Sequence, residues 1–179
     1  MTHNILDIIE EELFQDNIDA EIKENAIYWK DNHGAENVIR KSQTAVSGER
    51  MAWWQQNEVG KELVRIRLKK DLIVNWRPPI NTMGLGSMGC DYLEFYEDFL
   101  VLRYRDKHRE RVFIIHLNNL EIEEINLKGY KKKMKRVEGK LYVKTELEGE
   151  CLMLSLNPEG VIKEAISQEF LDSHKIILE

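Results

Sequence analysis

Cysteine is scarce in this sequence, and long apolar runs are absent. The 179 residues contain only two cysteines, Cys90 and Cys151, which lie far apart in the chain. A disulfide framework is therefore not expected, and cysteines alone could not hold a metal ion. No stretch of about eighteen apolar residues occurs, so no membrane-spanning helix is expected. The N-terminal residues MTHNILDIIEEE lack the basic and apolar regions of a secretory signal, and we expect a cytoplasmic protein.

The composition is that of a globular chain with an acidic excess. Lysine and arginine number 26, aspartate and glutamate number 32, and the formal net charge is −6. The apolar fraction of 42% is too high for a disordered chain, and the length suits one domain or a tight pair. Basic residues are concentrated in one place, because residues 128–144 hold eight bases and one acid between acidic stretches.

The first 80 residues predict a small α/β element. Apolar residues at helical spacing from Ile5 predict an amphipathic N-terminal helix. Period-two alternation over residues 18–30, with Glu24-Asn25 in the middle, predicts a hairpin. A short helix and two strands are expected at Glu49–Asn57, Leu63–Leu68 and Leu72–Trp76. The prolines that follow cannot donate to a sheet ladder, so we place the domain boundary between residues 80 and 81.

Residues 81–179 predict a meander of short strands followed by a helix. Seven strands are expected, at Tyr92–Tyr96, Phe99–Tyr104, Arg111–Leu117, Leu120–Ile125, Tyr130–Val137, Lys140–Leu147 and Cys151–Leu156. The turn residues Glu138-Gly139 and Glu148-Gly149 suit tight hairpins, which need positive φ angles. Asn157 as N-cap and Pro158 at the first helical position predict a C-terminal helix. Its apolar face would consist of Val161, Ile162, Ala165, Ile166 and Phe170.

The expected fold is therefore α+β. A bent antiparallel sheet of about seven strands would be closed by the C-terminal helix, with a smaller α/β N-terminal element beside it. The second half resembles a bacterial pleckstrin-homology-like, GRAM-related domain. The resemblance rests on the opening hairpin Leu93–Arg103, the strand Val112–Leu120 and the closing segment Asn157–Ile166. It implies binding rather than catalysis; phosphoinositide recognition is not implied, because the first turn, Glu97-Asp98, is acidic.

A basic segment is the main candidate site. Lys128, Lys131, Lys132, Lys133, Lys135 and Arg136 place six bases within nine residues. Such a segment attracts an anionic partner or surface, while a solvated edge protected by lysines is the structural alternative. A second basic group runs from Arg103 to Arg111, but Asp106 and Glu110 lie within it, so we expect it to neutralise itself. The net charge of −6 argues against nucleic acid as the partner.

The tryptophans Trp53 and Trp54 are candidates for binding a protein partner. Neighbours on a regular helix diverge by about 100°, so we expect one of the two to be exposed. Exposed tryptophan is enriched in binding hot spots. Packing between the two halves of the chain is the alternative.

Motifs for catalysis, metals or cofactors are weak. Residues 84–89 match G-x-G-x-x-G, but strand-like sequence follows instead of the helix that a dinucleotide site requires. The five histidines, including His116, have no metal-ligand spacing, and neither cysteine has a neighbouring base. We expect no enzyme activity, no metal and no cofactor.

The sequence thus favours a non-enzymatic binding or adaptor protein of bacterial type. Its basic segment would meet an anionic partner, with a protein as the first choice and peripheral contact with an anionic membrane as the second. The alternative is a small acidic inhibitor or immunity-type protein that binds and blocks a protein target. Salt separates these hypotheses, because simple attraction to a charged surface fades as ionic strength rises.

Overall fold

The computed structural model describes most of the chain as two compact units. The described residues are 6, 9, 20–31, 33–57, 62–78, 89–105, 109–127, 132–145 and 151–178. The units comprise residues 1–95 and 96–179, and each is treated by itself below. The boundary expected between residues 80 and 81 lies outside the described residues.

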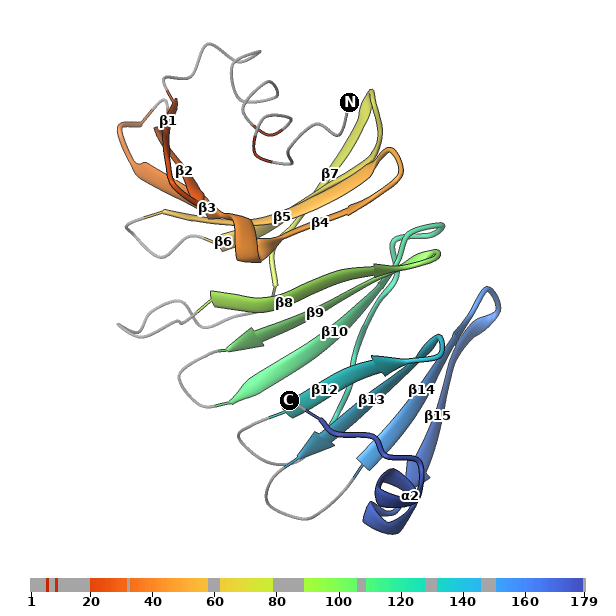
Figure 1. The fold of residues 1–179 in the computed structure, drawn as a ribbon. Coiled ribbons are helices and arrows are strands. Elements are labelled where there is room, and N and C mark those ends of the chain that lie inside the picture. The colour runs from red at the N-terminus through yellow and green to blue at the C-terminus, as the bar shows by residue number, and fades with distance from the viewer. Residues whose placement is uncertain are drawn as a thin grey trace. The chain divides into compact units, whose positions relative to one another are not determined.

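Strands dominate both units, so the expected α+β class is wrong (Figure 1). The strands form three antiparallel sheets. Those of the first sheet are β1 (Ala20–Lys23), β2 (Ala26–Lys30), β3 (Glu36–Arg40), β4 (Thr44–Ser47), β5 (Arg50–Asn57), β6 (Glu62–Lys69) and β7 (Leu72–Trp76). The second sheet contains β8 (Gly89–Tyr96), β9 (Phe99–Arg105), β10 (Glu110–His116) and β11 (Ile122–Glu124). The third sheet contains β12 (Lys132–Val137), β13 (Lys140–Thr145), β14 (Cys151–Asn157) and β15 (Gly160–Ile166). The 3-10 turn η1 (Lys41–Gln43) and the helix α2 (Gln168–Ser173) complete these elements.

The first sheet has the strand order β1-β2-β3-β5-β6-β7, with β4 paired to β5. The expected hairpin is confirmed as β1 and β2, whose turn begins at Glu24 with a φ of 40°. The two strands expected before the prolines are confirmed as β6 and β7. Side chains at alternate positions of β2, β3 and β5 build one apolar core on one face of this sheet. Its members are Ile27, Trp29, Ile39, Met51 and Trp53, and the helical residues Leu6 and Ile9 pack against them.

The helix expected over Glu49–Asn57 is wrong, because these residues form the turn before β5 and the strand itself. β5 pairs with β4 and β3 along one edge and with β6 along the other. Both faces of β5 are buried at four successive residues, Met51, Ala52, Trp53 and Trp54. Polar and apolar side chains therefore do not alternate along this part of the strand. A strand buried on both faces reads as a continuous apolar run, which periodicity alone does not distinguish from a helix. The rest of the expected N-terminal helix lies outside the described residues.

The second half contains two four-stranded sheets where one seven-stranded sheet was expected. Their strand orders are β11-β10-β9-β8 and β12-β13-β14-β15. The seven expected strands are nevertheless confirmed as β8–β14 within a few residues at each end. The turn between β12 and β13 has positive φ at both central residues, 48° at Glu138 and 76° at Gly139, as a tight hairpin requires. The turn expected at Glu148-Gly149 lies outside the described residues.

The expected C-terminal helix is largely wrong. Residues 160–166 form strand β15, which pairs with β14 from Cys151↔Ile166 to Asn157↔Gly160. Pro158 and Glu159 form the hairpin turn, and Gly160 has a φ of 146°, which ends the turn without a Cβ clash. Only α2 is helical, capped by the Ser167 hydroxyl, which accepts a hydrogen bond from the Phe170 amide. Of the three segments that carry the family resemblance, the closing one is thus a strand.

Helix α2 and the C-terminal segment cover one face of the β12–β15 sheet. Leu171 and Ile176 pack with Tyr142, Cys151 and Met153, all of which are buried. After α2 the chain runs back over the sheet toward β12 (Figure 1). No helix within the described ranges is long and apolar enough to cross a membrane.

Candidate functional site

The basic segment does not form one surface, because strand β12 sends alternate side chains to opposite faces of its sheet. Lys132 and Arg136 point to one face, and Lys133 and Lys135 to the other. Lys128 and Lys131 lie outside the described residues. The six bases predicted as a single site are therefore divided by the fold.

Lys132 and Arg136 serve the structure of the second unit. Lys132 is buried, its backbone N–H donates to Glu110 Oε2 at 2.6 Å, and its carbonyl accepts from Arg103 Nη1 at 2.6 Å. These bonds fasten the start of β12 to β9 and β10. The Arg136 guanidinium lies over the Tyr96 ring, 4.4 Å from its centroid. Lys132 is therefore unavailable to a partner, while Arg136 is exposed but engaged with Tyr96.

The other face carries three lysines, which we call the lysine face: Lys133, Lys135 and Lys144. Lys133 and Lys135 are exposed, and Lys144 lies directly opposite Lys133 in the antiparallel register of β12 and β13. Two like charges at directly opposed positions destabilise a strand pair. No ion pair to Lys133, Lys135 or Lys144 occurs among the described residues. The lysine face thus presents positive charge that this part of the chain does not neutralise.

A cleft of about 430 Å³ adjoins the lysine face. It is lined by Lys133, Lys144, Thr145, Gln168, Leu171, Asp172, Ile176, Ile177 and Leu178. Within the cleft, Gln168 is hydrogen-bonded to one basic and one acidic residue. The Gln168 Oε1 accepts from Lys144 Nζ, and the Gln168 Nε2 donates to Asp172 Oδ1 at 2.8 Å. The Ile177 side chain at the rim is 72% exposed. The cleft therefore combines ammonium groups with an accessible apolar edge.

The floor beside the lysine face is apolar. Burial raises the pKa of the Tyr142 hydroxyl and of the Cys151 thiol above their ordinary values. The thiol, which is the less reactive form of cysteine, is thereby favoured at Cys151. The Cys151 side chain is buried.

The expectation that Trp53 or Trp54 is exposed is wrong, because both side chains are fully buried. Trp53 belongs to the core of the first unit, and its indole N–H donates to Gln55 Oε1 at 3.2 Å. The Arg65 guanidinium lies 5.6 Å from the ring centroid of Trp53. Trp53 thus packs within the first unit, and neither tryptophan is exposed to a partner.

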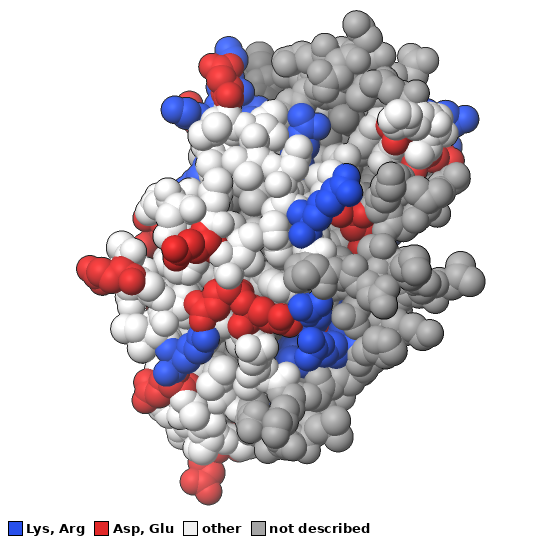
Figure 2. Space-filling view, turned by 180° about the vertical axis from the view of Figure 1, so that it is seen from behind, with Lys and Arg blue, Asp and Glu red and all other residues white. Residues whose placement is uncertain are grey.

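The arginine group of β9 and β10 neutralises itself, as the sequence predicted. Arg105 and Glu110 form an ion pair at 2.6 Å, and Arg111 holds both carboxylate oxygens of Glu124 at 2.7 and 2.8 Å. Arg111 thereby lowers the pKa of Glu124, and Arg109, at 3.9 Å, adds to the effect. Glu124 lies on β11, and its part in this group was not foreseen. Figure 2 shows acidic and basic side chains intermingled on the face that it presents.

The remaining motifs bring little chemistry together. The G-x-G-x-x-G residues 84–88 lie outside the described residues, and Gly89 begins strand β8. His116 packs edge-on against Phe99, with ring centroids 4.7 Å apart. Among the described residues, no three His, Cys, Asp or Glu side chains are grouped as a metal site.

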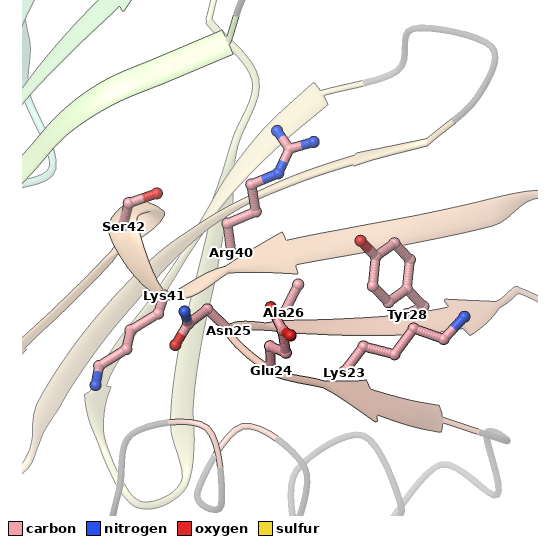
Figure 3. Close-up of a pocket in the computed structure, with 8 residues that line it drawn as sticks. All are labelled: Lys23, Glu24, Asn25, Ala26, Tyr28, Arg40, Lys41 and Ser42. Atoms are coloured by element: carbon pink, nitrogen blue, oxygen red, sulfur yellow. The ribbon is translucent and has the colours of Figure 1, made fainter.

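A larger pocket in the first unit was not foreseen from the sequence. Its volume is about 840 Å³, and it lies at the β1–β2 turn and the β3–η1 junction (Figure 3). The lining residues are Lys23, Glu24, Asn25, Ala26, Tyr28, Arg40, Lys41 and Ser42. These residues fall in three separate stretches of sequence, and only the register of β1, β2 and β3 brings them together.

The chain matches no protein-family model and no curated protein sequence.

Proposed function

We propose that this chain is a non-enzymatic, cytoplasmic binding or adaptor protein that holds an acidic protein partner on its lysine face. The observation that carries the proposal is the opposed pair Lys133 and Lys144 at the edge of a cleft. A carboxylate-bearing partner would reduce the repulsion between the two ammonium groups. This reduction would make the free energy of binding more favourable.

The shape and composition of the cleft favour a protein segment as the occupant. Exposed Ile177 offers apolar contact beside the lysines. An acidic segment with one apolar side chain matches both features, because interfaces combine an apolar centre with a charged rim. The cleft beside the lysines suits such a segment better than it suits a flat bilayer surface. An inhibitor that binds through Trp53 and Trp54 is not proposed, since both side chains are buried.

The test is capture from a lysate of the source organism with the full chain as bait, at several salt concentrations. Lys133→Glu combined with Lys144→Glu should abolish recovery of the partner protein, because the cleft edge becomes acidic. Lys132 is left unchanged, since it is buried between β10 and β9. Lys69→Glu combined with Lys70→Glu is the matched control, because both lysines are exposed and the charge change is the same.

Two outcomes would overturn the proposal. Recovery of the same proteins by wild type and by the Lys133/Lys144 variant would exclude the lysine face as the binding surface. Sedimentation with phosphatidylglycerol vesicles, lost in that variant and absent with phosphatidylcholine vesicles, would assign the lysine face to a membrane instead of a protein.

A further inference from the structure

The pocket in residues 1–95 has the features of a site for a small phosphorylated ligand. It is formed by side chains that share one face of three adjacent strands. Ala26 pairs with both Lys23 on β1 and Arg40 on β3, and Tyr28 lies two residues further along β2. Cross-strand partners point to the same side of a sheet, so Lys23, Tyr28 and Arg40 lie opposite the core face of Ile27 and Ile39.

The pocket is predominantly positive. Lys23, Arg40 and Lys41 line it, against one acidic residue, Glu24. Lys23 has partners already, since its ammonium lies 3.1 Å from Glu21 and 5.2 Å from the ring centroid of Tyr28. Arg40 and Lys41 are exposed, and neither side chain has an ion pair or hydrogen bond with the described residues.

Arg40 differs from five other arginines of the described residues, whose guanidinium groups are all engaged. Arg105 and Arg111 pair with carboxylates, and Arg50, Arg65 and Arg136 lie over aromatic rings. Arg40 instead extends from β3 at the edge of the cavity of about 840 Å³. An unpaired guanidinium at a cavity presents the planar donor fork that binds phosphate with two parallel hydrogen bonds.

Side chains near Arg40 and a fixed backbone complete the proposed phosphate site. Figure 3 shows Arg40 and Tyr28 extending from adjacent strands to the same side, with Ser42 beyond the end of β3. The backbone that carries them is held in place, because the Lys41 N–H donates to the Asn25 carbonyl at 2.9 Å. The Thr44 hydroxyl in turn donates to the Lys41 carbonyl at 2.6 Å. The junction between β3 and η1 is thus tied to the β1–β2 turn before any ligand arrives.

We propose that this pocket binds a small phosphate ester, with the phosphate on Arg40 and the organic part against Tyr28. The volume of about 840 Å³ is within the range of small-molecule sites and larger than a lone phosphate needs. The half-buried Tyr28 ring offers an aromatic surface for a base or a sugar. The proposal is independent of the lysine face, which belongs to the other unit.

The experiment is titration of the full chain, labelled with 15N, while amide NMR shifts are followed. The probes are inorganic phosphate, ribose 5-phosphate, adenosine 5′-monophosphate and adenosine. The phosphate esters should shift amides within residues 23–42 and bind more tightly than adenosine. Arg40→Gln should weaken binding of the esters roughly ten- to hundredfold, because charge-assisted hydrogen bonds are lost.

Matched variants make the result decisive. Arg77→Gln removes another exposed arginine of the same unit, outside the pocket, and should leave binding unchanged. Arg40→Lys keeps the charge without the planar fork and should bind at an intermediate level. Because Arg40 is exposed, its variants should keep the wild-type far-UV circular dichroism spectrum.

Several outcomes would overturn the proposal. Absence of shifts with every phosphate ester at millimolar concentration would do so, as would equal loss of binding in Arg40→Gln and Arg77→Gln. Adenosine binding as tightly as its monophosphate would exclude phosphate as the recognised group. Equal affinity for inorganic phosphate and for both esters would exclude the proposed contact of the organic part with Tyr28.

Discussion

Two groups of basic side chains in the second unit differ in whether they are paired with carboxylates of the chain. The arginines of β9 and β10 are paired within the chain: Arg105 with Glu110, and Arg111 with Glu124. Lys133 and Lys135 on β12 are exposed instead, and Lys133 lies directly opposite Lys144 of β13. The difference follows burial, since Arg111 is only 12% exposed while Lys133 is exposed.

This comparison shows which charges the fold itself requires. A buried charge without a partner costs several kcal/mol, roughly, so the arginines are retained only with their carboxylates. An exposed ammonium keeps its hydration and needs no partner. Positive charge that the structure does not use is therefore available for binding, and it lies on the lysine face.

The largest effect on stability is expected from Glu110→Ala. This carboxylate is buried and accepts hydrogen bonds from Arg105 and from the Lys132 amide. Its removal should lower the free energy of unfolding by about 3–5 kcal/mol, because a buried charge and a buried N–H lose their partner. Urea unfolding followed by circular dichroism measures the change, with the exposed Glu121→Ala as control. A loss as small as the control's would show that the arginine group is not structurally required.

A smaller effect is expected from Glu124→Gln, about 1.5–3 kcal/mol at neutral pH, because the bidentate bond to Arg111 loses its charge. Arg111 lowers the pKa of Glu124 below the ordinary 4.5 in the folded state. The stabilisation is therefore complete above pH about 4.5 and is lost as pH falls below that value. Between pH 5 and pH 3 the free energy of unfolding should fall less steeply in Glu124→Gln than in wild type. Parallel curves would contradict the assigned role of Arg111.

The smallest effect is expected from Lys133→Gln, which removes one of two opposed like charges. Stability should rise by about 0.2–0.5 kcal/mol at low salt, and the gain should disappear near 1 M salt, where screening is strong. Thermal unfolding at two salt concentrations, with Lys69→Gln as control, measures this. Destabilisation by Lys133→Gln would mean that Lys133 has a structural partner. The positive charge of the lysine face would then not be available for binding.

Local sequence predicted the strands well where turns and alternation agreed. The hairpin at Glu24-Asn25 and the strands from β8 to β14 follow two-residue turns and alternating apolar positions, which depend on neighbouring residues only. The failures lie where one pattern suits two structures. Val161, Ile162, Ala165 and Ile166 fit a helix face, yet pairing with β14 satisfies the backbone of the same residues as a strand.

Only part of each site was visible in the sequence. The charge of Lys133 and Lys135 is evident in the basic segment, but Lys144 becomes their neighbour only through the β12–β13 register. Nothing in the sequence relates Arg40 to Tyr28, because they lie on different strands and share one face of the sheet only after folding.

The sequence by itself determined where most strands begin and end, and where positive charge is concentrated. Both depend on residues close together in the chain, through turn geometry, side-chain alternation and composition. The tertiary structure alone decided the all-β architecture at β5 and β15, the burial of both tryptophans and the division of the basic segment between two faces. The physical reason is that each of these depends on which strand pairs with which, and strand pairing joins residues that are distant in the chain.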